Sequence, residues 1–193
     1  MLKIGYLGPE GNYSSHAAKI YDKENLKIPF NTINEVLNSL KSSDASQVIV
    51  PLENSINGSI VEVLDFLASK NNFQIIAELN IEINHSIYSL DKINPVNVEV
   101  VYSHPQALAQ CYDYLVNNFK NAKHKASNST ADSYNDLINS NEKGVFIGPP
   151  WMKEQDGIIV MGENIQSVKN NVTRFVVISD KKTNKKTVSD KTS

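Results

Sequence analysis

Arginine is almost absent from this chain. Of its 19 basic residues, 18 are lysine and only Arg174 is arginine. The planar guanidinium binds a carboxylate through two parallel hydrogen bonds, which a lysine ammonium cannot do. Arg174 stands at the head of an apolar stretch, within Asn171-Val172-Thr173-Arg174-Phe175. This position makes it a candidate for binding a carboxylate, with chance placement among basic residues as the alternative.

Cysteine is equally scarce, since Cys111 is the only one in the sequence. A single cysteine excludes an internal disulfide framework and a thiolate cluster for zinc, and it is typical of a reducing cytoplasm. Leu108, Cys111 and Leu115 follow helical apolar spacing, which predicts a core thiol rather than a reactive one. The four histidines lack metal-ligand spacing, so no metal is expected.

Long apolar runs and a strong charge of either sign are also missing. The chain is 40% hydrophobic and 21% charged, with a formal net charge of -2 and a pI of about 6.1. Its apolar runs are shorter than a membrane span, so no transmembrane or secretory segment is expected. Because nucleic acids and anionic membranes require a basic surface, neither is predicted as a partner.

Short β-branched runs alternate with amphipathic stretches, which is typical of an α/β protein. The predicted strands are Lys3 to Leu7, Gln47 to Pro51, Phe73 to Ala77, Val98 to Tyr102, Gly144 to Ile147, Ile158 to Met161 and Thr173 to Ile178. The predicted helices are Ser14 to Tyr21, Ile33 to Ser42, Ser59 to Ala68, His104 to Asn118 and Ala131 to Asn139. Extended-type residues continue from Phe73 to Leu90, which favours a crossing between two lobes.

Polar turns follow several of these strands. Gly8 to Ser15 is rich in glycine and serine, which favours either a tight turn or backbone amides that face an anion. Glu53, Asn54 and Ser55 precede a helix whose predicted cap is Ser59, at capping-box distance from Glu62. Because ligands of open α/β sheets bind at the carboxyl ends of strands, these three residues are candidate site residues.

Two further junctions have the same character. Ser103 is the predicted N-cap of a helix that carries Gln106 at capping-box distance and Gln110 one turn later. Gln110 could face a cleft or water. Ser127 to Thr130 supplies more polar groups than one cap needs. Helix N-termini and neutral donors of this kind can bind an anion without a net positive charge.

Taken in order, five motifs resemble those of prephenate dehydratases, over roughly residues 1 to 180. The motifs are Gly8-Pro9-Glu10-Gly11; Val50 to Ser55 with Gly58; Ser103 to Cys111; Ser129-Thr130-Ala131; and Asn171 to Phe175. The resemblance implies a two-lobed α/β fold like type II periplasmic binding proteins, with the active site in the interlobe cleft. It assigns residues 1–76 and 160–180 to one lobe, 77–159 to the other, and 181–193 to a linker or tail.

The implied activity is a lyase reaction of phenylalanine biosynthesis, in which prephenate becomes phenylpyruvate, water and carbon dioxide without an organic cofactor or metal. Aromatisation drives the reaction, so the enzyme must orient a dianion and assist a departing hydroxyl. By the resemblance, Thr173 donates to that hydroxyl and Arg174 holds a carboxylate, so the two side chains are expected to converge on one ligand. Threonine is a very weak acid, so a hydrogen bond is expected from it unless Glu53 or water relays a proton.

The resemblance also assigns the remaining site residues. Thr173, Glu53, Asn54, Ser103 and Gln110 are the predicted catalytic residues, and Arg174, Ser55, Ser129, Thr130 and Phe175 are the predicted substrate contacts. Glu53 would repel a dianion, so we expect either a raised pKa or a carboxylate that points away and orients Asn54 or Gln110.

Three alternatives share this sequence pattern: an arogenate dehydratase, a prephenate decarboxylase that leaves the ring non-aromatic, and a non-catalytic anion-binding protein. A homodimer is expected by resemblance. Ser189 to Ser193 resembles the opening of the phenylalanine-sensing ACT domain that follows in this family. We therefore expect a catalytic domain that phenylalanine does not inhibit in the absence of the sensing domain.

Overall fold

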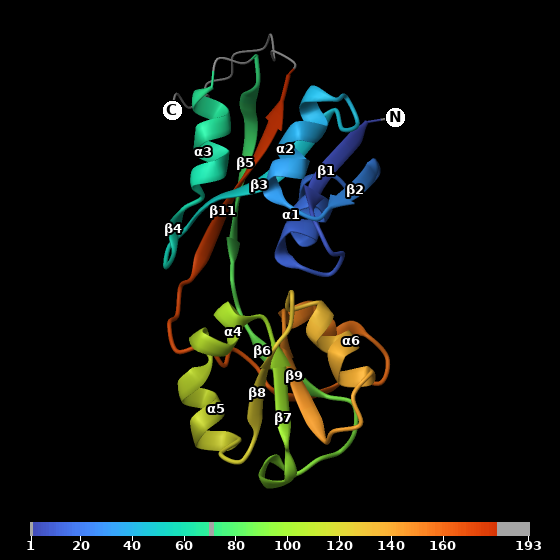
Figure 1. Cartoon of the computed structure of the whole chain (residues 1–193), viewed down its shortest axis with the longest axis vertical. Coiled ribbons are helices and arrows are strands. Elements are labelled where there is room, and N and C mark those ends of the chain that lie inside the picture. Colours follow the sequence, from blue (N-terminus) through green and yellow to red (C-terminus); the bar gives the residue numbers. More distant parts are fainter. Residues whose placement is uncertain (1, 70–71, 181–193) are drawn as a thin grey trace. The chain divides into compact units, whose positions relative to one another are not determined.

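Two β-sheets organise the chain, each with its own covering helices (Figure 1). The computed structural model describes residues 2–69 and 72–180. Within these, one compact unit contains residues 2–8, 17–81 apart from 70 and 71, and 173–180; the other contains Pro9–His16 and Glu82–Val172. This division confirms the mixed α/β class with two sheets.

The first unit has the sheet order β2-β1-β3-β11-β5, with the short β4 paired to β3. Its strands are β1 (Lys3–Leu7), β2 (Leu26–Phe30), β3 (Gln47–Asn54), β4 (Gly58–Ser59), β5 (Gln74–Glu82) and β11 (Val172–Ser179). Its helices are α1 (Tyr13–Tyr21), α2 (Ile33–Lys41) and α3 (Val61–Ala68). Strands β2 and β3 run parallel to β1, whereas β11 runs antiparallel to β3. Helix α1 and strands β5 and β11 each contain a boundary between the two units.

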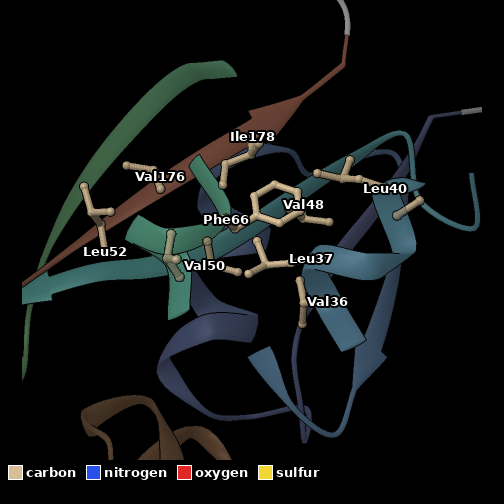
Figure 2. Packing of buried hydrophobic residues seen from close by; sticks show 11 residues of the cluster. Val36, Leu37, Leu40, Val48, Val50, Leu52, Phe66, Val176 and Ile178 are labelled. Carbon is tan, nitrogen blue, oxygen red and sulfur yellow. The ribbon is translucent and has the colours of Figure 1, made fainter. Parts of the chain in front are cut away.

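Alternate residues of β3 and β11 form the core of the first unit (Figure 2). Val48 and Val50 of β3 and Val176 and Ile178 of β11 pack with Leu37 of α2. These residues share one sheet face because strand side chains alternate between faces. Phe66 of α3 joins the same cluster, so α2 and α3 cover this face and fix the β3–β11 pair in place.

The second unit has the sheet order β10-β6-β9-β7-β8. Its strands are β6 (Ser86–Ser89), β7 (Val100–Ser103), β8 (Lys123–Ala126), β9 (Gly144–Gly148) and β10 (Ile159–Gly162). Its helices are α4 (Pro105–Gln110), α5 (Tyr112–Asn118) and α6 (Asp132–Ile138), with 3₁₀ turns at Pro95–Asn97 and Pro150–Glu154. Val101, Val145 and Ile147 face the buried residues of α4 and α5, whereas Tyr102 and Phe146 face Leu137 of α6.

Several sequence-based expectations about local structure were wrong. Helix α3 begins after Ile60 with no side-chain cap, because Ser59 is in β4, so the Ser59–Glu62 capping box is absent. The N-cap of α4 is His104, whose Nδ1 accepts from the Gln106 amide at 3.3 Å, rather than Ser103. The helix predicted over His104 to Asn118 is interrupted at Cys111.

The division into units also differs from the predicted lobes. Residues 77–81 belong to the first unit, and 160–172 belong to the second. Pro9–His16 belongs to the second unit, although the sequence placed it with the first. The predicted tail, residues 181–193, lies outside the described residues.

Candidate functional site

The register of β3 against β11 brings two of the predicted motifs together in the first unit. Thr173 is the partner of Asn54, and Arg174 is the partner of Glu53. The register shifts between Arg174 and Phe175, whose partner is Pro51. Leu52 is therefore the extra residue of a β-bulge, a feature that re-aims side chains and is frequent next to active sites.

Thr173 and Asn54 are joined by a hydrogen bond between their side chains. The Asn54 Nδ2 donates to the Thr173 Oγ1 at 2.9 Å. The other end of the amide is also held, since Oδ1 accepts from the backbone N–H groups of Ile56 and Asn57 at 3.0 and 3.1 Å. This Asx turn fixes which way the amide points. The Thr173 oxygen thus acts as an acceptor, and no described residue accepts from its hydroxyl hydrogen.

Arg174 lies between two carboxylates. Its Nε and Nη2 donate to Oε2 of Glu78 on β5 at 2.9 and 2.6 Å, and its Nη1 lies 3.3 Å from Oε1 of Glu53. The pKa of Arg174 is raised, first by its hydrogen bond to Glu78 and then by its hydrogen bond to Glu53. The Glu78 contact is the stronger of the two, because it is shorter, uses two nitrogens and is less exposed.

Thr173 and Arg174 are held by different partners. Successive residues of a strand project from opposite faces, and these two have separate partners. With one guanidinium between two carboxylates, the formal charge of the Arg174 cluster is -1, which does not favour a further carboxylate. The convergence of both side chains on one dianion stays a prediction, as does a substrate contact by Arg174.

The two remaining candidates of the first unit have contrasting environments. Ser55 is exposed in the turn after β3, where a ligand could reach it. Phe175 is only 2% exposed and packs inside the unit. Burial in the core gives Phe175 a structural role, and its substrate contact stays a prediction.

In the second unit, Ser103 ends β7 just before α4, and Gln110 is the last residue of α4. Ser103 is fully buried, and its hydroxyl donates to the carbonyl of Ile147 on β9 at 3.0 Å. This bond ties β7 to its neighbouring strand, and a substrate contact by Ser103 stays a prediction. Gln110 is half-buried, with its Oε1 2.8 Å from Nε2 of His85 and 3.4 Å from Nδ2 of Asn171.

Ser129 and Thr130 lie just before α6 in the same unit. The Ser129 hydroxyl accepts from the Asp132 amide and donates to the Asp132 carboxylate, both at 2.9 Å. The Thr130 carbonyl accepts from the Ser133 hydroxyl at 2.7 Å. These bonds give both residues a structural role at the start of α6, and their predicted substrate contacts remain predictions.

Sequence reasoning missed Glu78 and His85 as members of these clusters, because no local pattern marks either residue. Asn171 opens the last of the five motifs, but no role was assigned to it, since only the tertiary fold brings it to Gln110. A hollow of about 610 Å³ in the second unit, lined by residues 90–94, 97, 137, 138 and 140–144, contains none of the predicted site residues.

Cys111 is confirmed as a core residue. It is fully buried beside Leu115, and burial raises the pKa of its thiol to about 12. Within residues 2–69 and 72–180, no group of three or more His, Cys, Asp or Glu side chains could hold a metal ion. No helix of the described part of the chain is long and apolar enough to cross a membrane.

Comparison with known proteins decides the family. The model of the family described as prephenate dehydratase matches residues 4–183. The chain belongs to the prephenate dehydratase family. This confirms the resemblance carried by the five sequence motifs.

Individual prephenate dehydratases agree with that assignment. The chain is 35% identical to a bifunctional chorismate mutase/prephenate dehydratase of Buchnera aphidicola subsp. Schizaphis graminum, over 94% of this chain and 48% of that protein. It is 34% identical to the prephenate dehydratase of Methanocaldococcus jannaschii, over 91% of this chain and 64% of that protein. The chain thus spans about half to two thirds of the length of these relatives.

A solved structure shows the same fold. The prephenate dehydratase of Arthrobacter aurescens, in complex with L-Phe, superposes with a TM-score of 0.82 at 26% identity, over 92% of this chain and 60% of that one. The arrangement of strands and helices is therefore that of a prephenate dehydratase.

Proposed function

We propose that this protein converts prephenate to phenylpyruvate, water and carbon dioxide, and so acts in phenylalanine biosynthesis. Membership of the prephenate dehydratase family supports this reaction. The observation that carries the proposal is the hydrogen bond from Asn54 to Thr173, because it leaves the threonine hydroxyl hydrogen for another acceptor. A hydroxyl that leaves a ring requires such a donor.

Carbon dioxide and the hydroxyl leave from opposite carbons of the ring. The bond between the ring carbon and its carboxylate breaks, and its electron pair enters the ring as carbon dioxide departs. The ring in turn expels the hydroxyl at the opposite carbon, which takes up a proton and leaves as water. Thr173 stabilises the charge that develops on this oxygen by donating a hydrogen bond, since its own pKa is too high for full proton transfer. The proton comes from a relay through water or Glu53.

Arg174 fits a positioning role on the opposite face of β11. Glu78 fixes its Nε and Nη2, so Nη1 is held toward Glu53 beside Asn54. This arrangement restrains the end of β3 and hence the amide that orients Thr173. The alternative, in which a substrate carboxylate replaces Glu53 at Nη1, is the role that the sequence resemblance assigns to Arg174.

The remaining assignments extend this proposal. Ser55, Ser129, Thr130, Ser103 and Gln110 are proposed contributors to binding or catalysis on the strength of the family motifs. A cytoplasmic location and a homodimer are likewise proposals that rest on the sequence.

The test is to incubate the purified chain with prephenate at neutral pH and measure phenylpyruvate against a reaction without enzyme. Thr173→Ala should lower kcat by about a hundredfold or more, as expected for loss of a donor to a developing oxyanion. Thr173→Ser should keep most of the activity, because it retains the hydroxyl.

Thr32→Ala is a matched control, since the hydroxyl of Thr32 caps α2 by accepting from the Glu35 amide at 3.1 Å. This variant should lose about 1 kcal/mol of stability but no catalytic rate. A non-aromatic product would identify a decarboxylase. Faster turnover of arogenate than of prephenate would identify an arogenate dehydratase. Binding without turnover would identify an anion-binding protein.

A further inference from the structure

The side-chain amide of Gln110 is held by two donors that share its oxygen. His85 Nε2 lies 2.8 Å from Gln110 Oε1, and Asn171 Nδ2 donates to the same atom at 3.4 Å. A carbonyl oxygen has two acceptor sites, so this one has a donor for each. The amide nitrogen of Gln110 has no hydrogen-bond partner among the described residues, and the side chain is only half-buried.

The contact also fixes the tautomer of His85. Because an amide oxygen can only accept, the imidazole must carry its hydrogen on Nε2. Nδ1 is then a bare acceptor, and it is buried with no partner. The His85 side chain is 4% exposed, and burial lowers its pKa, which keeps the ring neutral near pH 7. An unpaired buried polar atom is costly, so a function for His85 beyond packing is expected.

The main chain on both sides of this contact is restrained by one segment. The His85 amide donates to Gln166 Oε1 at 2.9 Å, and the Ser167 amide donates to the Gln110 carbonyl at 2.8 Å. Gln166 also donates to Asn84 Oδ1 at 2.7 Å. His85 and Gln110 are therefore held at fixed positions within the second unit, and their side-chain contact has a defined geometry.

We propose that His85 is a positioning residue that locks the Gln110 amide with its oxygen inward and its NH₂ group outward. Gln110 then presents hydrogen-bond donors only, so it is set to bind a carboxylate, keto or hydroxyl oxygen of the substrate. This inference rests on the proposed dehydratase function. Without the lock, the amide could turn by half a rotation and present its oxygen, which would repel an anion.

The test compares two amides at position 85 in the full chain. In His85→Gln, the side-chain NH₂ group can take the place of imidazole Nε2 and donate to Gln110. In His85→Asn, the shorter amide reaches only the Nδ1 position. We expect His85→Asn to lower kcat/KM for prephenate by about tenfold, the effect of one hydrogen bond, and His85→Gln to restore it to within about threefold of wild type.

A double-mutant cycle with Gln110→Ala separates positioning from a general structural effect. In the Gln110→Ala background, His85→Asn should cause no further loss of kcat/KM, because the group that it positions is gone. A further tenfold loss in that background, or equal losses in His85→Asn and His85→Gln, would overturn the proposal. Thermal unfolding of each variant identifies any that fail to fold, and activity is compared only among folded variants.

A spectroscopic measurement keeps this inference distinct from the proposed function. The ¹⁵N chemical shifts of the His85 ring should show protonation at Nε2 alone, and the side-chain amide of Gln110 should give one ordered pair of proton signals. In His85→Asn, the Gln110 amide signals should shift toward those of a mobile side chain, whether or not the protein turns over prephenate. An Nδ1-protonated ring in wild type would refute the lock even if the dehydratase activity is found.

Discussion

Strand geometry separates Thr173 and Arg174, although they are adjacent in the sequence. Thr173 meets the amide of Asn54, whereas Arg174 meets the carboxylates of Glu53 and Glu78. One residue is thus arranged to donate from its hydroxyl, and the other to hold charged groups in place. The different chemistry of the two neighbours follows from their opposite directions in a strand.

Replacing Arg174 distinguishes its two roles at the residue scale. For Arg174→Gln, we expect kcat to fall by about tenfold and KM to change by less than about threefold, since a positioning residue acts on the reacting geometry. Steady-state kinetics with prephenate measure both constants. Lys153→Gln removes an exposed ion pair with Glu163 and should change neither. A large rise in KM at constant kcat would instead show a direct carboxylate contact.

Cys111 should be inert toward alkylating reagents in the native protein. Its pKa of about 12 leaves almost no thiolate at pH 8, and its side chain is fully buried. Incubation with iodoacetamide should therefore leave activity and mass unchanged, whereas the urea-unfolded chain should gain one adduct. Rapid labelling of the folded protein, detected by mass spectrometry, would contradict this.

At the edges of the sheets, pairing with a neighbouring strand forms strands that the local sequence pattern does not predict. Strand β2 contains Pro29, and β8 is exposed along its whole length, and neither was among the predicted strands. Both lie at sheet edges, where proline and lysine are tolerated and limit further pairing. The break between α4 and α5 is similar: the Gln110 carbonyl accepts from Ser167 instead of continuing the helix.

The packing of α2 against its sheet yields a prediction at the element scale. Leu37 is 2% exposed in the cluster of Figure 2, so Leu37→Ala should lower the free energy of unfolding by about 2–5 kcal/mol through lost contacts and a cavity. Leu64→Ala on α3 is the matched control, because Leu64 is 42% exposed, and its effect should stay within about 0.5 kcal/mol. Urea denaturation measures both values, and equal losses would refute the assignment of the core.

Acid should destabilise the whole molecule partly through His85. Burial lowers the pKa of His85 in the folded state below its usual value of 6.5. At a pH between the folded-state pKa and 6.5, the unfolded chain therefore binds more protons than the folded chain. The folded state therefore loses stability as the pH falls below about 6.5. Urea unfolding at pH 7.5 and pH 5.0 should show a smaller acid loss in His85→Gln than in wild type. An equal loss in both would contradict a buried neutral His85.

The scaffold of the candidate site was largely predictable from local signals. The spans of β1, α2 and β9 matched their apolar patterns to within a residue, and the Val50 to Ser55 and Asn171 to Phe175 motifs were placed on β3, its following turn and β11. The Asn54–Thr173 bond, the bulge at Leu52 and the Glu78–Arg174 pair could not be predicted. Each depends on a register between strands far apart in the chain, and single-sequence periodicity does not set that register.

By itself, the sequence determined the α/β class, the family and the residues that carry its motifs, because these depend on residue order and local periodicity. Only the tertiary structure decided what those residues do to one another. It gave Thr173 and Arg174 different partners, buried Phe175 and Ser103, and brought His85 to Gln110. Packing between distant segments fixes side-chain direction and hydrogen-bond partners, and local residue preferences do not determine them.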